Sequence, residues 1–209
     1  MMKLQTDSEG LLMVKKILLP YTLLIVLLLS ACTPGGFKAD HKYKVEPFEF
    51  TNQQNKQVSL DDLKGTVWIS QFIFTNCTAA CPPMMANMAK LQDLLVKEGI
   101  EDYKIVSFSI EPEADTPEVL QEYLSAYDVA DESKWEMLTG YSQKKIIDIA
   151  AKTFKTAVID DPANNTVLHG TSFSLVNQKG EFVKSYSGLS DVPYEEIAKD
   201  MKALIKQGK

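Results

Sequence analysis

Two cysteines stand between a predicted buried strand and a predicted helix, and this segment constrains the fold more than any other part of the chain. Residues Val67 to Phe74 are nearly continuous in apolar side chains, as expected of a strand covered on both faces. Cys77 and Cys81 follow, and Pro83 to Lys97 carries apolar residues at helical spacing. Both thiols therefore lie near the N-terminal end of a helix, where the backbone dipole favours thiolate over thiol. A thiolate pair in this position either exchanges disulfides or binds a soft metal ion.

Strand and helix patterns continue along the chain and indicate an α/β domain. Strands are predicted at 48–50, 58–60, 66–74, 104–110, 136–138, 171–176 and 181–185. Helices are predicted at 83–97, 117–127, 142–152 and 194–206, and an exposed loop or hairpin at 157–167. Asp115 or Thr116 is expected to cap the second helix ahead of Pro117.

This order of elements is that of a thioredoxin-like fold with an N-terminal β-hairpin and a mid-chain insertion. In that fold the dithiol loop follows the first central strand, as it does here. Apolar strands with helices between them predict a mostly parallel sheet that is covered on both faces. The hairpin of residues 171–185 is expected to form its edge.

The N-terminus has the features of a bacterial export signal. Two lysines precede the apolar run Ile17 to Leu29, whose 13 residues are fewer than the roughly 20 that a membrane span needs. The run ends in Leu29-Ser30-Ala31-Cys32, which resembles a lipoprotein box. We therefore predict a signal peptide at residues 1–31, with Met13 as an alternative start, and a diacyl lipid on Cys32. The alternative is a short uncleaved membrane anchor with an incidental cysteine, and both place the folded part outside the cytoplasmic membrane.

The remaining chain divides into a tether and one domain. Residues 32–44 contain Pro34-Gly35-Gly36 and several charges, which predicts a flexible tether, and the domain is expected at 45–209. The formal net charge is −6, and all 22 basic residues are lysines. This balance argues against a nucleic-acid partner, which needs a basic surface.

A histidine adds a third candidate ligand to the two thiols. His41 lies in the predicted tether, whereas His169 lies in the predicted domain, just ahead of the strand that begins at residue 171. In thioredoxin-like folds the loop before that strand passes over the dithiol, which brings His169 toward Cys77 and Cys81. Two thiolates and an imidazole suit Cu(I), Cu(II) or Zn(II). From the residues alone, a surface histidine or one that only orients a thiol remains open.

The spacing of the cysteines differs from that of ordinary redox pairs. Three residues separate Cys77 from Cys81, one more than in Cys-x-x-Cys. The longer loop leaves room for a metal ion between the sulfurs and still permits a disulfide. A purely structural disulfide is a poor explanation, because closing so small a loop adds little stability.

Three stretches carry a resemblance to a known family. They are Phe74-Thr75-Asn76-Cys77-Thr78-Ala79-Ala80-Cys81-Pro82, Ser109-Ile110-Glu111-Pro112-Glu113-Ala114-Asp115-Thr116-Pro117-Glu118 and Leu168-His169-Gly170-Thr171. With them, the chain resembles the Sco/SenC family of copper-binding, thioredoxin-like proteins that serve cytochrome c oxidase assembly, over roughly Val45 to Lys206. The resemblance implies that Cys77, Cys81 and His169 are copper ligands.

The chain departs from the family pattern inside these stretches. The family often has proline directly after the first cysteine and an acidic residue within the loop, where this chain has Thr78 and Ala79-Ala80. The common Asp-Pro pair appears as Glu111-Pro112. The three implied ligands are intact, so the departures affect loop stiffness, site charge and the choice of partner.

The resemblance implies an extracytoplasmic copper metallochaperone for the copper A centre of cytochrome c oxidase, and not an enzyme in the turnover sense. Its expected partner is the copper-accepting oxidase subunit, and its expected location is the outer face of the bacterial cytoplasmic membrane, held by the lipid on Cys32. One alternative is a thiol-disulfide reductase that uses Cys77 and Cys81 to keep the oxidase cysteines reduced. Another is a redox sensor or peroxidase, although the chain has no arginine to polarise a peroxide.

Two further groups near the site are weaker candidates. Cu(II) usually takes four ligands, and Asp160 or Asp161 is a hypothetical fourth, although their surroundings are typical of a solvated turn. Met84, Met85 and Met88 follow the dithiol and offer thioethers to Cu(I), but methionines also fill irregular gaps in a core.

Overall fold

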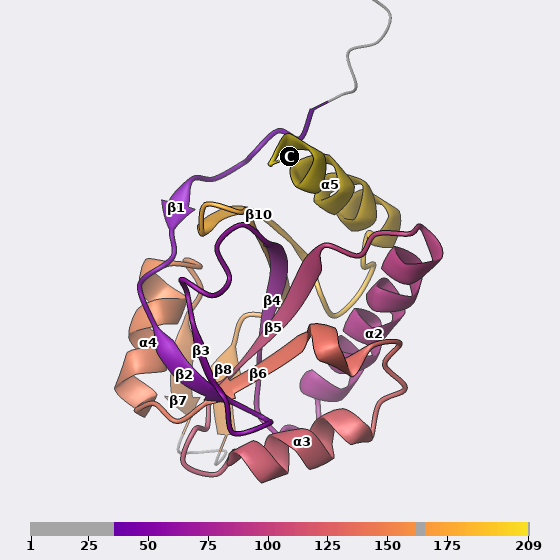
Figure 1. Cartoon of the computed structure of the whole chain (residues 1–209). Helices are drawn as coiled ribbons and strands as arrows, with labels where there is room; N and C mark the ends of the chain where they lie inside the picture. Colours follow the sequence, from indigo (N-terminus) through magenta and orange to yellow (C-terminus); the bar gives the residue numbers. More distant parts are fainter. Residues whose placement is uncertain (1–35, 162–165, 209) are drawn as a thin grey trace, which may run out of the picture. The chain divides into compact units, whose positions relative to one another are not determined.

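A sheet of eight strands forms the centre of the computed structural model, which describes residues 36–161 and 166–208 (Figure 1). In spatial order the strands are β1 (Tyr43–Lys44), β10 (Glu181–Ser187), β9 (Ser172–Val176), β4 (Val67–Ile73), β5 (Tyr103–Ser109), β6 (Trp135–Thr139), β2 (Glu49–Asn52) and β3 (Gln57–Ser59). A separate ladder pairs β7 (Val158–Asp161) with β8 (Thr166–His169). The predicted signal peptide and the lipidation site Cys32 lie outside the described residues. Within the described ranges, no helix is long and apolar enough to span a bilayer.

Parallel pairing is confined to the three central strands of the described sheet. β4 pairs with β5 and β5 pairs with β6 in parallel, whereas β9 joins β4 and β2 joins β6 antiparallel. The prediction of a mostly parallel sheet is therefore wrong. An apolar run indicates that a strand is buried on both faces, but it does not fix the direction of its neighbours. Here both terminal hairpins, β2–β3 and β9–β10, add to the central strands with opposite direction.

The short strand β1 occupies the edge that we expected the C-terminal hairpin to form. It pairs antiparallel with β10, and the N–H groups of Asp40 and His41 donate to the carbonyl of Val183 at 2.9 and 3.0 Å. The His41 ring also lies 5.0 Å from the Phe182 ring. Part of the segment predicted as a tether thus belongs to the folded domain, which begins before residue 45. Its backbone covers an otherwise free edge of β10.

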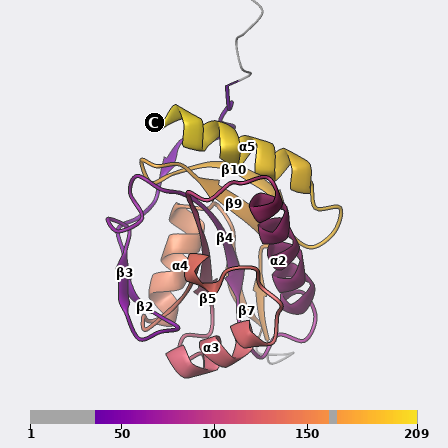
Figure 2. The ribbon, with the colours of Figure 1, turned by 45° about the vertical axis from the view of Figure 1, so that its right-hand side comes forward.

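The helices of the described chain lie where the apolar periodicity predicts them. They are α2 (Cys81–Lys97), α3 (Pro117–Ser125), α4 (Gln143–Lys152) and α5 (Tyr194–Gln207), and a 3-10 turn spans Glu132–Lys134. α2 and α5 contact each other on one side of the central strands, and α4 lies on the other side (Figure 2). Thr116 caps α3 and Ser142 caps α4, each by accepting a backbone N–H with its side chain.

The core on the α4 side contains an aromatic cluster around Phe108 of β5. Rings of four other residues lie 5.6 to 6.5 Å from it, namely Phe48, Trp68, Phe72 and Phe154. All five side chains are buried. Burial on this scale fixes β4 and β5 relative to each other. The loops that follow these strands therefore start from fixed positions.

Candidate metal centre

Cys77 and Cys81 lie at the junction between β4 and α2. Cys81 is the first residue of α2 and is fully buried, whereas Cys77 in the preceding loop is half-buried. Both are free thiols, and the Cys81 N–H donates to the Cys77 sulfur at 3.2 Å. α2 begins two residues earlier than predicted, because prolines are tolerated in the first turn, where an N–H has no intrahelical partner. The first sulfur therefore receives an N–H group at the helix N-terminus.

A buried carboxylate holds the start of the dithiol loop. Asp115 is fully buried and accepts hydrogen bonds from the Thr75 N–H at 3.2 Å and the Thr75 hydroxyl at 2.6 Å. Its other oxygen accepts from the Ser109 hydroxyl at 2.5 Å. Asp115 was one of two expected caps for α3, but Thr116 takes that role and leaves Asp115 free to turn inward. The loop that carries Cys77 is thus tied to the end of β5.

His169 approaches the dithiol from the separate β7–β8 ladder. It is the last residue of β8, pairs with Val158, and is not in a loop as predicted. Its Nε2 lies 3.5 Å from the Cys81 sulfur, and its Nδ1 lies 2.9 Å from the Gly170 carbonyl oxygen. A carbonyl only accepts, so Nδ1 carries the proton and Nε2 presents its lone pair to the sulfur. Fixing the tautomer in this way is how proteins prepare a histidine for metal binding.

The three candidate ligand atoms are close enough to share one ion. The two sulfurs and a ring nitrogen of His169 all lie within 4.8 Å of one another. Two sulfurs that each lie about 2.3 Å from one ion can be at most about 4.6 Å apart, so the group fits an ion with shifts of a few tenths of an ångström. The sequence therefore predicts this convergence correctly, although Cys81 and His169 are 88 residues apart.

Local electrostatics separate the two thiols. Burial raises the pKa of Cys77, but hydrogen bonds from Cys81 and from the backbone of Ala79 and Ala80 outweigh it, and the pKa falls below that of an ordinary cysteine. Burial raises the pKa of Cys81, and the hydrogen bond with Cys77 raises it further. Burial also lowers the pKa of His169, which favours the neutral imidazole that binds metals.

The three methionines do not join the site. Met84, Met85 and Met88 are fully buried, so they fill the core and offer no exposed thioether. The sulfur of Met85 instead accepts a hydrogen bond from the Gln71 amide at 3.1 Å. The backbone of Asp160 and of Asp161 belongs to β7, but their side chains lie outside the described part of the structure.

Sequence reasoning missed two residues that position the site. Asp115 was assigned only as a possible cap, yet an aspartate beside a Thr-Pro cap has no helical role left and is free to turn inward. Gly170 supplies the carbonyl for His169, and a Cβ there would lie 2.1 Å from the Thr156 hydroxyl oxygen. A side chain at this position would therefore force the Thr156 side chain or the backbone to shift.

Comparison with known proteins now places this dithiol and histidine in a family. The SCO1/SenC family model matches residues 38–206. The chain belongs to the SCO1/SenC family. It is 44% identical over 180 residues to the SCO1 protein homolog of Bacillus subtilis (strain 168), an alignment that covers 86% of this chain and 92% of that protein.

Solved SCO1/SenC structures share the thioredoxin-like fold. A SCO1/SenC family lipoprotein from Bacillus anthracis str. Ames has a TM-score of 0.74 and 46% identity, over 78% of this chain and 95% of that one. BsSco, a member of the Sco family of cytochrome c oxidase assembly proteins in which a disulfide switch was identified, has a TM-score of 0.74 and 44% identity, over 81% and 97%. Copper-bound ScoI of Bradyrhizobium japonicum has a TM-score of 0.65 and 25% identity, over 78% and 99%.

The buried Asp115 contacts predict a stability effect. Asp115→Asn replaces one acceptor oxygen by an NH₂ group that faces the Ser109 hydroxyl, so we expect the free energy of unfolding to fall by about 2 kcal/mol in denaturant titration. Asp62→Asn is the matched control, because Asp62 accepts the same two kinds of hydrogen bond from Ser59 but is exposed. We expect it to change stability by less than about 0.5 kcal/mol. Equal effects of both substitutions would show that Asp115 does not anchor the loop.

The asymmetry of the thiols predicts a difference in reactivity. In metal-free protein at pH 7, iodoacetamide should modify Cys77 at least about 10-fold faster than Cys81, because Cys77 is more exposed and forms its thiolate at lower pH. Peptide mass spectrometry after short exposures separates the two sites. With rising pH the rate at Cys77 should increase and level off at a lower pH than for a free cysteine. Faster modification of Cys81 would contradict the assignment.

Proposed function

We propose that this chain binds one copper ion through Cys77, Cys81 and His169 and delivers it during assembly of the copper A centre of cytochrome c oxidase. The observation that carries the proposal is the convergence of two sulfurs and one neutral imidazole within 4.8 Å. Copper bound to a ScoI relative and the oxidase-assembly role stated for the Sco family support the same function for this chain.

The donor set suits copper in both oxidation states. Two thiolates and a neutral imidazole balance the charge of Cu(II) and leave Cu(I) with a net charge of −1. Soft thiolates select Cu(I), which accepts two or three ligands, and imidazole suits Cu(II) as well. The site can thus hold copper through a change of oxidation state without losing all of its ligands.

Exposure of the ligands suits transfer by ligand exchange. Cys77 is half-buried, so a cysteine of an incoming domain can reach an ion bound to it, whereas Cys81 is fully buried beneath it. The acceptor that fits this route is a domain that offers its own thiolates and imidazoles, as a copper-accepting oxidase subunit does. The chain then acts as a carrier of cargo and not as an enzyme with turnover.

A lipid on Cys32 would place the carrier at the outer face of the bacterial cytoplasmic membrane. The apolar run before Cys32 and the lipoprotein description of the Bacillus anthracis relative support this location. Residues 33–39 would then connect the anchored cysteine to the backbone contacts that begin at Asp40. This connection would hold the folded domain at the membrane surface.

A thiol-disulfide reductase is the second candidate function, and the asymmetry of the two thiols favours it. The Cys77 thiolate would attack a disulfide of the target, form a mixed disulfide and release one target thiolate. The released target thiolate would take the proton of Cys81, which would then attack the Cys77 sulfur, release the second target thiolate and leave a Cys77–Cys81 disulfide. Two electrons pass to the target in this sequence. The disulfide switch described for BsSco is the same type of chemistry.

Copper binding should depend on one of the two histidines only. In a copper titration read by visible absorption, the chain should bind one Cu(II) with a thiolate-to-copper band that disappears in Cys77→Ser and Cys81→Ser. His169→Ala should weaken binding by about 100-fold or more, because a ligand and not merely its support is lost. His41→Ala is the matched control and should bind as the natural chain does. Equal affinity of the His169→Ala variant would remove this histidine from the site.

The same histidine separates the two candidate functions. In single-turnover reduction of glutathione disulfide by the metal-free dithiol, His169→Ala should change the rate by less than about 3-fold, since Cys77 and Cys81 carry the electrons. Cys81→Ser should accumulate a mixed disulfide on Cys77, detected by intact mass. A chain that binds copper but does not reduce the disulfide is a carrier alone, whereas the reverse result would make it a reductase.

A further inference from the structure

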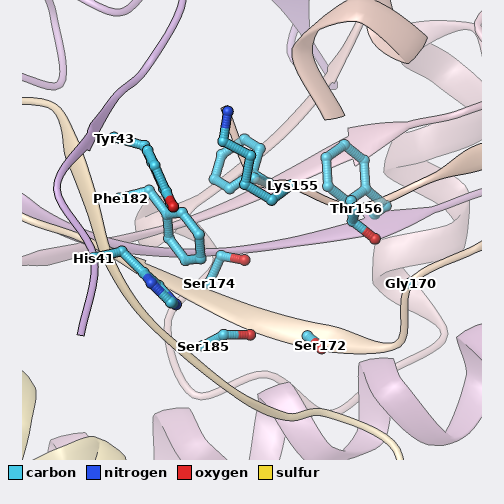
Figure 3. Close-up of a pocket in the computed structure, with 11 residues that line it drawn as sticks. His41, Tyr43, Lys155, Thr156, Gly170, Ser172, Ser174, Phe182 and Ser185 are labelled. Carbon is cyan, nitrogen blue, oxygen red and sulfur yellow. The ribbon is translucent and has the colours of Figure 1, made fainter. Parts of the chain in front are cut away.

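A cavity of about 290 Å³ lies beside the candidate metal centre but is not part of it (Figure 3). It is bounded by β1, β9 and β10 and by the chain that follows α4, and Gly170 is the residue that it shares with the surroundings of His169. None of the three candidate metal ligands lines it. This volume is at the small end of the range for ligand-binding pockets, so it suits a ligand of about one ring.

Aromatic rings form much of the cavity wall. They belong to Tyr43, Phe72, Phe154 and Phe182, and the imidazole of His41 joins them. His41 lies 5.0 Å from Phe182, and Phe154 lies 5.6 Å from the same ring. Aromatic walls at these separations favour a planar ring, which can meet their edges or faces.

Hydroxyl groups on the sheet face the same space. Ser174 and Ser185 are paired across β9 and β10, and Ser172 and Thr156 line the cavity beside them. Within the described residues, none of these four hydroxyls makes a hydrogen bond with the protein. Ser174 is 94% buried, since its relative exposure is 6%, and its side chain lines the cavity. Behind it, on the next strand, the hydroxyl of its register partner Ser70 is fully buried and also unpartnered.

Such hydroxyls need partners from a ligand or from water. Of these hydroxyls, the one that is fully buried without a partner among the described residues is that of Ser70, which costs free energy, whereas Ser172 and Ser185 are exposed. Here a row of three serines, Ser185, Ser174 and Ser70, crosses three neighbouring strands at one register. Ser70 lies behind the cavity, but Ser174 and Ser185 line it and offer both donors and acceptors, which match the hydroxyl or carbonyl substituents of a small ring.

The charges around the cavity favour a neutral ligand. Among the residues that the structure describes, no carboxylate lines it. The amine of Lys155 donates to the Lys152 carbonyl at 2.7 Å and lies 4.6 Å from the Tyr43 ring centroid. In Figure 3 this amine points away from the serine hydroxyls, so it does not present a cation to a ligand between them. A carboxylate or phosphate would therefore enter without a charged partner.

Gly170 connects the cavity to the histidine. Its carbonyl accepts the Nδ1 proton of His169 at 2.9 Å, and its backbone also lines the cavity against Thr156. A ligand that presses on Gly170 or Thr156 thus acts on the group that orients the His169 ring. Coupling of this kind is reciprocal, because each site changes the free energy of the other by the same amount.

We propose that this cavity binds a small neutral ring with hydroxyl substituents, of the phenol and quinol class, and that its occupancy shifts the His169 ring through Gly170. Stacking against the aromatic wall and hydrogen bonds to Ser174 and Ser185 provide the recognition. Binding of the ring requires no metal, so this proposal can be tested separately from the proposed copper delivery.

The two histidines of the chain provide direct probes of both parts of the proposal. His41 lines the cavity and His169 is the coupled residue. In metal-free full-length chain with carbon-13-labelled histidine, resorcinol should shift the ring signals of both histidines with one saturable midpoint, on the order of 1 mM for a ligand of this size. The same concentrations of 1,3-cyclohexanediol, which has the hydroxyls but not the aromatic ring, should leave both signals unchanged.

A pair of serine substitutions on one strand supplies the control. Ser185 and Ser187 are both exposed and lie two residues apart on β10, but only Ser185 lines the cavity. Ser185→Leu should weaken resorcinol binding at least about 10-fold, whereas Ser187→Leu should not change it. Shifts that do not saturate, that appear equally with cyclohexanediol, or that survive Ser185→Leu would overturn the site. A saturable shift of His41 with an unmoved His169 would overturn the coupling.

Discussion

The buried carboxylate of Asp115 is the constraint on which the rest of the site depends. A buried charge is costly unless hydrogen bonds satisfy it, and here the Thr75 N–H, the Thr75 hydroxyl and the Ser109 hydroxyl do so. These contacts join the loop after β4 to the end of β5, two strands that the apolar core already fixes in parallel register. The loop therefore leaves the sheet in one direction. The direction of the loop sets the positions of Cys77 and of the first turn of α2. It thereby sets the separation of the two sulfurs.

The same negative charge contributes to the difference between the thiols. It raises the pKa of Cys81, which burial and the hydrogen bond with Cys77 already raise, whereas backbone N–H groups at the start of α2 lower the pKa of Cys77. The Cys77 sulfur is thus accessible and reactive, whereas the Cys81 sulfur is buried and keeps its proton to higher pH. This arrangement suits a metal carrier and a reductase alike, because a carrier passes a metal ion, and a reductase passes electrons, through the Cys77 thiolate. What separates the two functions is the imidazole, which carries no electrons between the sulfurs but completes a metal site.

Most of the fold could be predicted from local patterns, because strands and helices follow from apolar spacing and caps. Burial of β4 on both faces and the Thr-Pro start of α3 are examples. The direction of the edge strands could not be predicted in this way, since it depends on which hairpin pairs with the sheet and not on the residues of the strand itself. β1 was missed because two residues carry no periodicity, and its pairing depends on the backbone of β10. At the site, residue types identified the donors, but the inward turn of Asp115 and the carbonyl of Gly170 are tertiary features that the spacing of residues does not encode.

The support of the three donors differs, and this bears on how an ion would leave. Both sulfurs belong to the junction of β4 with α2, which the main sheet and the core hold in place. His169 ends a ladder in which β7 and β8 pair only with each other among the described strands, and whose contacts run to α4. The imidazole is therefore the donor with the fewest backbone ties to the sheet. If an ion is released by losing one ligand at a time, withdrawing His169 costs the least free energy, because it is the least constrained ligand. The Gly170 carbonyl, which orients the His169 ring, would then control the release.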